Sequence, residues 1–215
     1  MNFLKKILRK FKYTARLLEL YFFSKKYLTP KGWFLSRFLL TPVDQNKVPL
    51  PWFTYASIHF ITQKLENTSF KVFEYGSGNS TLWFAPKVKS VVSVEHDKSF
   101  FDLKLQEISA LNNVDYQHIT LAEGYSDKIL EFTNEFDIVV IDGRDRVACA
   151  KNCIKALKQD GIVIWDNSDR DEYAEGYAHL TNNGFKKINF HGLGPINHRE
   201  WETSIFYRSE NCFNI

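Results

Sequence analysis

Short apolar runs alternate with longer amphipathic stretches along most of the chain. Five of the runs are rich in β-branched and aromatic residues and are bounded by polar or turn-forming residues, which is typical of buried strands. These runs predict strands over 70–75, 90–95, 116–121, 136–141 and 161–165. The stretches between them carry apolar residues at helical spacing and predict helices from 80 onward, over 97–109, over 125–132 and over 146–157.

The order of these elements predicts the fold class. Strands that alternate with helices form mainly parallel sheets with both faces covered. Residues 185–190 and 202–207 are strand-like runs with no helix between them, which predicts a terminal antiparallel hairpin. We therefore expect an α/β fold, doubly wound, with a mainly parallel seven-stranded sheet, a terminal antiparallel strand and helices on both faces. The loop 191–201 would overhang the carboxyl ends of the strands, where open α/β sheets bind ligands.

Length and composition predict one substantial core. The chain has 215 residues, of which 44% are hydrophobic, and shows no internal repeat. We divide it into an N-terminal extension over 1–32, a proline-marked connector over 33–56 and one α/β domain over 57–215. The three cysteines lack metal-finger spacing, which predicts a reduced, cytoplasmic setting and a packing role for Cys149 and Cys153.

The N-terminal extension departs from the average composition. Residues 1–32 contain nine basic residues and one acid, so this segment carries a net charge of +8 while the whole chain carries +3. Its apolar residues recur at helical spacing, which predicts a basic amphipathic helix. They are Phe3, Leu4, Ile7, Leu8 and Phe11. Lysines and arginines interrupt this pattern too often for a signal peptide or a membrane span.

Three kinds of partner suit such a helix. An anionic membrane surface would accept its apolar face while the lysines pair with headgroups, which would place the protein peripherally on the inner membrane face through residues 1–28. Packing on the domain or on a second subunit is the alternative. Nucleic acid is favoured by charge alone, and we do not expect it, because the rest of the chain is mildly acidic. The sequence does not predict the oligomeric state.

The most informative turn follows the first strand. In FKVFEYGSGNS, residues 70–80, Gly76 and Gly78 allow the backbone to turn tightly and to approach a ligand. A dinucleotide fingerprint would have a third glycine where Thr81 stands. Glu74 precedes the turn, where a carboxylate would repel a pyrophosphate and attract the ammonium and sulfonium groups of S-adenosylmethionine. The charge pattern therefore favours S-adenosylmethionine over NAD.

The second strand ends in a further acid. Glu95 lies 19 residues after Gly76 and is followed by His96. An acid about 20 residues after such a turn reaches the ribose hydroxyls of a bound nucleotide. We therefore include Glu95 and His96 among the cofactor-binding residues. The adenosine signal is shared with NAD enzymes, and helix capping is the structural alternative for Glu95.

These motifs together resemble the class I S-adenosylmethionine-dependent methyltransferases, over roughly residues 53–207. Residues 74–78 look like the first motif of that family, Glu95 like its ribose-binding acid, 136–143 like its fourth-strand motif and 161–167 like its fifth strand. More narrowly, PWFTYASIHF, FEYGSGNSTLW, VVSVEHD and IDGRDR resemble a little-characterised group of bacterial methyltransferases.

The resemblance also implies an adenine site. Tyr125 and Ser126, after the third strand, stand where such enzymes recognise adenine. Glu123 or Ser126 would then bond to the edge of the ring.

A second polar group gathers at the strand ends. Asp142 follows the fourth strand, and Asp166 and Asn167 follow the fifth, where a helix-capping turn is the alternative. Two carboxylates and an amide oxygen are hard ligands that suit Mg²⁺ or another divalent cation. The pattern resembles the metal site of catechol and caffeoyl-coenzyme A O-methyltransferases. Those enzymes carry a catalytic lysine where this chain has Asp145, which puts a catechol-type mechanism in doubt.

Methyl transfer to oxygen needs a group that takes the proton of the acceptor. His191 and His198 are candidates because imidazole titrates near neutrality, and Asp145 is a third. We expect a methyltransferase that acts on oxygen of a small molecule or glycan. Two alternatives stay open: an NAD-dependent oxidoreductase on the same kind of sheet, and a non-catalytic membrane-associated module that retains the fold.

Overall fold

Seven strands form one sheet in the order β3-β2-β1-β4-β5-β7-β6 in the computed structural model, which describes residues 2–66 and 68–215, with side chains from Lys10 onward. The first five strands pair in parallel, and β7 runs antiparallel to both β5 and β6. The strands are β1 Lys71–Tyr75, β2 Ser90–Glu95, β3 Val114–His118, β4 Phe136–Ile141, β5 Leu157–Asp166, β6 Lys186–Gly192 and β7 Trp201–Tyr207. This topology confirms the predicted fold class.

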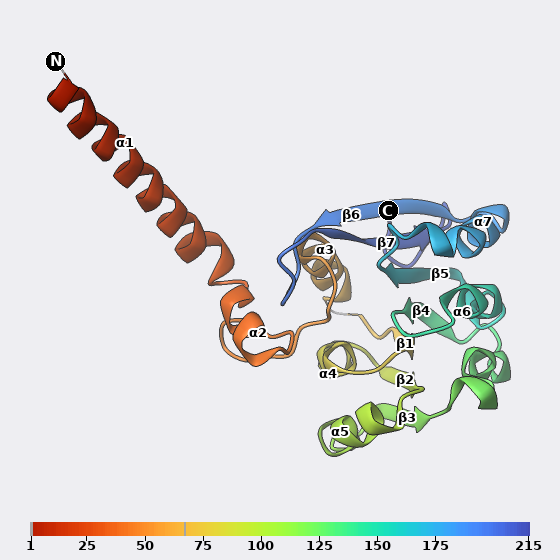
Figure 1. The fold of residues 1–215 in the computed structure, drawn as a ribbon. Helices are drawn as coiled ribbons and strands as arrows, with labels where there is room; N and C mark the ends of the chain where they lie inside the picture. The colour runs from red at the N-terminus through yellow and green to blue at the C-terminus, as the bar shows by residue number, and fades with distance from the viewer. Residues whose placement is uncertain (1, 67) are drawn as a thin grey trace.

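Helices cover both faces of the sheet. Figure 1 shows α3, α4 and α5 on one face and α6 and α7 on the other. The α-helices are α1 Asn2–Phe23, α2 Trp33–Leu39, α3 Tyr55–Leu65, α4 Asn79–Phe84, α5 Lys98–Ser109, α6 Arg146–Cys153 and α7 Ala174–Asn182. Shorter turns are π-helical at η1 Ser24–Leu28 and 3-10 helical at η2 Ala85–Lys87, η3 Leu121–Glu123, η4 Tyr125–Glu131 and η5 Asp171–Tyr173.

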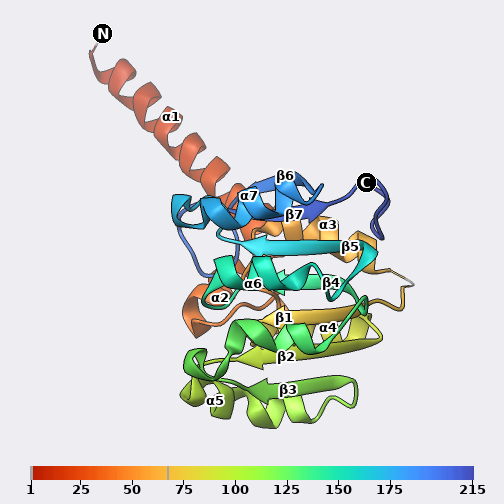
Figure 2. The ribbon, with the colours of Figure 1, turned by 90° about the vertical axis from the view of Figure 1, so that its right-hand side faces the viewer.

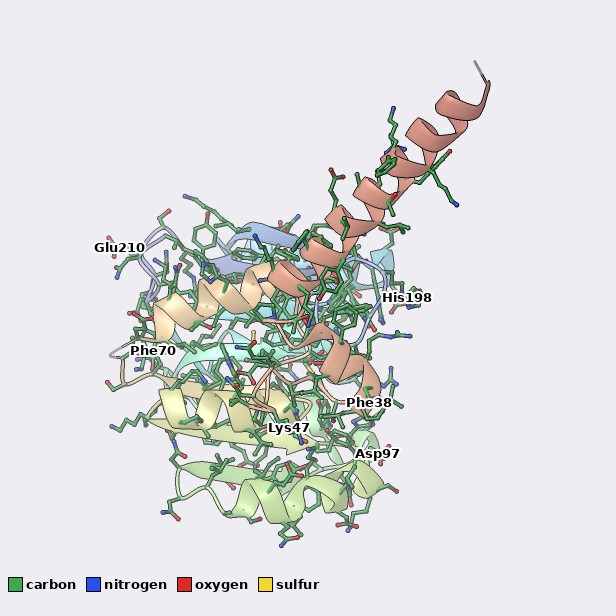
Figure 3. The ribbon with its side chains drawn as sticks, turned by 90° about the vertical axis from the view of Figure 1, so that its left-hand side faces the viewer. Phe38, Lys47, Phe70, Asp97, His198 and Glu210 are labelled. Carbon is green, nitrogen blue, oxygen red and sulfur yellow. The ribbon has the colours of Figure 1, made fainter. Side chains whose placement is uncertain are left out.

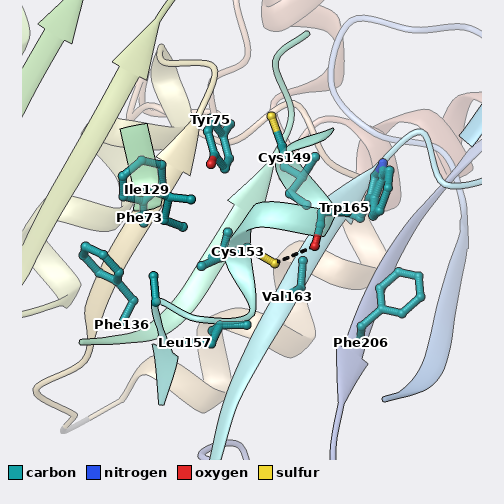
Figure 4. Close-up of a cluster of buried hydrophobic side chains, with 14 of the residues drawn as sticks. Phe73, Tyr75, Ile129, Phe136, Cys149, Cys153, Leu157, Val163, Trp165 and Phe206 are labelled. Carbon is teal, nitrogen blue, oxygen red and sulfur yellow. Dashed lines mark hydrogen bonds between the residues drawn. The ribbon is translucent and has the colours of Figure 1, made fainter. Parts of the chain in front are cut away.

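The central strand β4 lies between two apolar cores. All six of its residues are buried, as expected for a parallel strand with helices on both sides. Figure 4 shows the core on the α6 face, where Cys149 and Cys153 lie close to Trp165 and Val163. Both cysteines are fully buried, and burial raises the pKa of the Cys153 thiol to about 12. The cysteines therefore pack as small apolar groups, as the sequence predicts.

Some element boundaries differ from the predicted ones. Ser57 and the apolar residues over 58–65 predict a helix that Ser57 caps. The helix begins at Tyr55 instead, because the Thr54 side chain accepts a hydrogen bond from the Ser57 amide at 3.4 Å. The stretch 125–132 is the 3-10 turn η4 rather than an α-helix. The strand β3 begins at Val114, two residues before the predicted start, because Val91 of β2 pairs with it there.

The connector 33–56 is more ordered than its prolines imply. It contains α2, which begins after Gly32 in a left-handed conformation with φ of 73°. A Cβ at Gly32 would lie 2.2 Å from the Val43 carbonyl oxygen, so only glycine fits there. The buried Ser36 hydroxyl donates to the Val43 carbonyl at 2.8 Å and accepts from the Val43 amide at 3.0 Å. These bonds close the connector into a loop.

Helix α1 projects away from the rest of the molecule, as Figures 1 and 2 show. All the side chains from Lys10 to Phe23 are exposed. Across the part of the chain that the structure describes, no helix combines the length and the apolar character that crossing a bilayer requires. The predicted N-terminal helix is present as α1, and from Lys10 to Phe23 the side chains on all its faces are exposed, whereas Phe3, Leu4, Ile7 and Leu8 of the prediction lie outside the described side chains.

Replacing Ser36 with alanine should destabilise the protein. The substitution leaves the buried amide and carbonyl of Val43 without their hydroxyl partner, which costs about 1–3 kcal/mol of unfolding free energy. Urea unfolding followed by circular dichroism measures the difference. Ser109→Ala, at an exposed position, is the matched control and should stay within about 0.5 kcal/mol of wild type. Equal stability of the two variants would contradict the proposed role of Ser36.

Candidate functional site

A cavity of about 630 Å³ opens at the carboxyl ends of the parallel strands. Figure 2 shows these strands pointing toward the side on which α2 lies. Six residues chosen from the sequence line the cavity: Gly76, Glu95, His96, Asp142, Asp166 and Asn167. The connector contributes Trp52, and the late loop contributes Asn197 and Arg199. The loop 191–201 therefore does reach the site.

The glycine turn brings two strand ends into backbone contact. Gly76 follows β1 with φ of 86°, and a Cβ there would lie 2.7 Å from the backbone of Gly143, which follows β4. A Cβ on Gly143 would in turn lie 2.0 Å from the Tyr125 hydroxyl. Two glycines are thus needed for this approach, since any side chain would push β1 and β4 apart. The approach forms the floor of the cavity.

Glu74 lies behind the turn and not in the cavity wall. Its carboxylate is fully buried and accepts hydrogen bonds from the Thr81 hydroxyl at 2.5 Å and the Ser93 hydroxyl at 2.7 Å. Thr81 also accepts a bond from the Gly78 amide at 3.1 Å, so the residue in place of a third glycine organises the turn. Burial raises the pKa of Glu74 to about 7, against the lowering effect of these hydroxyls. Direct contact of Glu74 with a ligand in the cavity stays a prediction.

Glu95 ties the ends of β1 and β2 together. One carboxylate oxygen accepts from the Ser77 amide at 3.0 Å and the Ser77 hydroxyl at 3.1 Å. The other accepts from the amides of His96 and Asp97, both at 2.9 Å. Only 4% of Glu95 is exposed, yet it lines the cavity. A ribose hydroxyl that bonds to Glu95 would replace the Ser77 hydroxyl, which also has Tyr116 as a partner at 2.8 Å.

The expected adenine residues lie outside the cavity wall. Tyr125 is fully buried and packs its ring against that of His96, with centroids 5.7 Å apart. Ser126 contributes its carbonyl, which accepts from the Tyr75 hydroxyl at 2.8 Å. Glu123 is held by Thr120 in a capping box. Of these side chains, His96 alone lines the cavity, so adenine recognition by Tyr125 and Ser126 stays a prediction.

Two carboxylates and a guanidinium meet at the ends of β4 and β5. The buried Arg146 side chain lies 3.2 Å from an Asp142 carboxylate oxygen and donates to the backbone carbonyls of Asp142, Gly143 and Asp166. Asp166 accepts from the Trp201 indole at 2.9 Å and the Thr203 hydroxyl at 2.6 Å. Burial raises the pKa of both carboxyls, that of Asp166 to about 6. The Asp166 charge raises the pKa of Asp142 further, while the Arg146 charge lowers the pKa of both.

The donor set fits a resident guanidinium better than a divalent ion. Arg146 already supplies positive charge to Asp142, and one Asp166 oxygen is committed to two neutral donors. Within residues 2–66 and 68–215, no cluster of three or more His, Cys, Asp or Glu side chains is placed to hold a metal ion. Metal binding by Asp142, Asp166 and Asn167 stays a prediction from the sequence.

The three expected bases do not line the cavity. His191 lies in β6 with a side chain 60% exposed, 3.9 Å from Glu200. His198 lies beside Arg37 of α2 at 3.5 Å, and Asp145 is exposed at the start of α6. Figure 3 labels His198 at the same edge of the molecule as Asp97, which does line the cavity. A catalytic role for His191, His198 or Asp145 stays a prediction without support from their positions.

Sequence reasoning missed the arginines of the site. Arg144, Arg146, Arg170 and Arg199 all line the cavity. Arg144 and Arg146 stand in IDGRDR, which the sequence singles out for other reasons, Arg170 follows the fifth-strand motif, and Arg199 stands in the late loop. Their positions in the sequence could have indicated the site, because all four follow predicted strand ends or precede the last predicted strand. Because the chain outside the N-terminal extension carries a net negative charge, its composition gives no indication of a basic group at the site.

The comparisons with solved structures concern about seven tenths of the chain. The precorrin-6y C5,15-methyltransferase from Geobacter metallireducens superposes with a TM-score of 0.55 at 15% identity, covering 74% of this chain and 92% of that one. An rRNA methylase from Streptococcus thermophilus gives a TM-score of 0.52 at 15% identity, covering 70% and 93%. This chain has the class I methyltransferase fold. The resemblance stated from the sequence is thereby confirmed for the fold.

Other comparisons show how far the similarity to known proteins extends. Spermidine synthase from Thermotoga maritima gives a TM-score of 0.52 at 16% identity, and the match covers 69% of this chain and 56% of that one, so the chain spans little more than half of that protein. No family model matches the sequence. No curated protein matches it either. Identities this low establish the fold alone.

The pH dependence of the unfolding free energy should report on the protonation of the buried Glu74 carboxyl. A carboxyl whose pKa is raised in the folded state binds more protons there than in the unfolded chain, so stability falls as pH rises from about 4.5 to about 7. Glu74→Gln removes this proton binding and should flatten the pH dependence of the unfolding free energy across that window. Urea titrations at intervals of pH measure it.

Glu66→Gln is the matched control for that experiment, because Glu66 is exposed at the end of α3. The control should keep the wild-type slope. A Glu74→Gln slope as steep as wild type would show that Glu74 does not hold a proton in the folded protein.

Proposed function

We propose that this protein transfers the methyl group of S-adenosylmethionine to an acceptor. The observation that carries the proposal is the contact of Gly76 with Gly143, which forms a cavity floor beside the carboxylate of Glu95. The fold of the chain supports it. The cavity volume of about 630 Å³ lies in the usual range for small-molecule sites, about 300–1,000 Å³.

The charge around the turn favours a cationic cofactor. Glu95 and Asp97 both line the cavity next to the turn, and Glu74 lies behind it. Two carboxylates there would repel the pyrophosphate of NAD and attract the sulfonium and ammonium groups of S-adenosylmethionine. Thr81, where a dinucleotide fingerprint has glycine, is bonded to the Gly78 amide. The oxidoreductase alternative is therefore the weaker one.

We further propose an oxygen acceptor on a small molecule or glycan. The Asp142 carboxylate lines the cavity beside the turn, where it would accept the proton of an acceptor hydroxyl. Trp52 of the connector and Asn197 of the late loop also line the cavity and would position the acceptor. A cavity of this volume, lined by four strand ends and two loops, suits a compact acceptor. The rRNA methylase similarity carries the fold alone, so we do not propose a nucleic-acid acceptor.

Binding of S-adenosylhomocysteine by isothermal titration calorimetry tests the cofactor. Wild type should bind it saturably and should not bind NADH. Glu95→Gln should weaken binding roughly 10- to 100-fold, since a hydrogen bond to a charged group contributes about 1.5–3 kcal/mol. Glu107→Gln, an exposed acid on α5, is the matched control and should bind as wild type does. Saturable NADH binding without S-adenosylhomocysteine binding would favour the oxidoreductase.

We also propose that α1 lies on an anionic membrane surface. Phe11, Leu18 and Phe22 share one face of the helix at spacings of seven and four, and each is at least half exposed. Lys12 and Arg16 lie to one side of this face, about 100–140° around the helix. Exposed apolar side chains in an isolated basic helix are typical of interfacial binding, where the apolar face enters the lipid and the basic residues meet headgroups.

Helix α2 and the residue that follows it carry further exposed apolar side chains. Phe38 is 84% exposed and Leu40 is 76% exposed. Figure 3 shows Phe38 at the edge of the molecule that also carries Asp97 of the cavity wall. Trp33 of α2 donates to the carbonyl of Asn197 at 2.9 Å, which links α2 to the late loop. A membrane bound by α1 and α2 would therefore face the side of the molecule on which the cavity opens.

Co-sedimentation of the full chain with phosphatidylglycerol vesicles tests this orientation. Binding is expected, with weaker binding at high salt and to phosphatidylcholine vesicles. Substituting serine at Phe11, Leu18 and Phe22 together should reduce binding roughly tenfold or more. Serine at Leu103 and Leu121, exposed on the domain, is the control and should have no effect. Packing of the helix on a second subunit predicts a different result. Wild type would then not bind vesicles, and the triple variant would have a different oligomeric mass from wild type.

A further inference from the structure

The cavity wall is divided by charge. The part that follows β1 and β2 carries the acids Glu95 and Asp97. The part that follows β4 and β5, together with the late loop, carries four guanidinium groups, those of Arg144, Arg146, Arg170 and Arg199, against two acids, Asp142 and Asp166, so arginines outnumber acids there. The two parts face one space, so a ligand that fills the cavity meets negative charge at one end and positive charge at the other.

Arg146 is occupied by the protein itself. It pairs with Asp142 and donates to three backbone carbonyls. It is buried, with 8% of its surface exposed. This arginine therefore neutralises the strand ends and has little capacity left for a ligand.

The other three arginines retain donors for a ligand. Arg170 contacts the Tyr173 hydroxyl at 3.3 Å and an exposed Glu172 oxygen at 3.6 Å, which leaves part of its guanidinium open. Among the described residues, the guanidinium groups of Arg144 and Arg199 have no carboxylate within 4.0 Å and form no hydrogen bond; the Cys149 thiol donates only to the backbone carbonyl of Arg144. Both are exposed at the mouth of the cavity.

Guanidinium groups that share a cavity without carboxylate partners repel one another. Such an arrangement is stabilised when an anion enters, because the planar guanidinium bonds to two oxygens of a carboxylate or phosphate at once. Asn167 and Asn197 lie in the same wall and add neutral donors. These groups come from three separate loops, after β4, after β5 and before β7, and only the fold brings them together.

We propose that the methyl acceptor carries an anionic group, a phosphate or a carboxylate, that Arg144, Arg170 and Arg199 hold. This inference rests on the proposed methyl transfer and names the class of acceptor. The anionic group is distinct from the hydroxyl that receives the methyl group. It positions that hydroxyl toward the turn at Gly76, where the cofactor would lie.

Three sugars that differ at one group test the proposal. Glucose 6-phosphate, glucuronate and glucose are titrated into the wild-type protein saturated with S-adenosylhomocysteine, and isothermal titration calorimetry measures binding. The phosphate or the carboxylate sugar should bind, and the difference between them identifies the preferred anion. Glucose should bind at least roughly tenfold more weakly. Glucose binding as tightly as both charged sugars would overturn the proposal.

Variants separate a specific anion site from general attraction. Arg144→Gln and Arg199→Gln should each weaken binding of the charged sugar roughly tenfold or more. Arg199→Lys should recover part of the loss, since lysine keeps the charge without the bidentate geometry. Arg16→Gln removes the same charge from α1, outside the cavity, and should have no effect. Unchanged binding in both glutamine variants would overturn the proposal.

Binding of S-adenosylhomocysteine distinguishes the proposed anionic acceptor from the proposed methyl transfer. Arg199→Gln should bind S-adenosylhomocysteine as wild type does, because Arg199 stands in the late loop and not beside the glycine turn. Intact cofactor binding without any binding of the charged sugars would reject the anionic acceptor and leave methyl transfer standing. Absence of cofactor binding in wild type would reject methyl transfer itself.

Discussion

One buried guanidinium holds the acceptor side of this site together. Arg146 reaches back from the first turn of α6 and donates to carbonyls at the ends of both β4 and β5, while it pairs with Asp142. Burying two carboxylates side by side is costly, and a fixed positive charge between them offsets that cost. The strand ends can therefore lie close enough to form one wall. Every group that faces the acceptor is placed relative to this pair of strands.

The cofactor side depends on the absence of side chains instead. Gly76 and Gly143 let the ends of β1 and β4 touch, and the Tyr125 hydroxyl fills the space that a side chain at Gly143 would need. Glu95 then joins this turn to β2 through Ser77. The cavity therefore has a cofactor side formed by the backbone contact of two glycines and an acceptor side held by the Arg146 guanidinium. Its two ends differ in charge. That difference would orient a ligand with opposite charges, such as a cationic cofactor next to an anionic acceptor.

Much of the fold could be predicted because it follows from local patterns. Apolar runs of five or six residues with helical stretches between them fix a parallel order, and the missing helix between β6 and β7 marks the reversal. The glycine turn and the position of Glu95 were likewise readable from spacing. Errors arose where a long-range contact decides a local boundary. Thr54 begins α3, for example, where its amide bonds to Thr203 in the distant strand β7.

By itself the sequence determined the topology, the turn and the charge of the N-terminal extension, because these depend on neighbours along the chain. Only the tertiary structure decided which side chains share the cavity. It placed Glu74 behind the turn, since β1 directs alternate residues to opposite faces. It left His191 and His198 outside the cavity wall and gathered the arginines of three loops. Such grouping depends on where loops from distant strands meet, and no spacing along the chain records that.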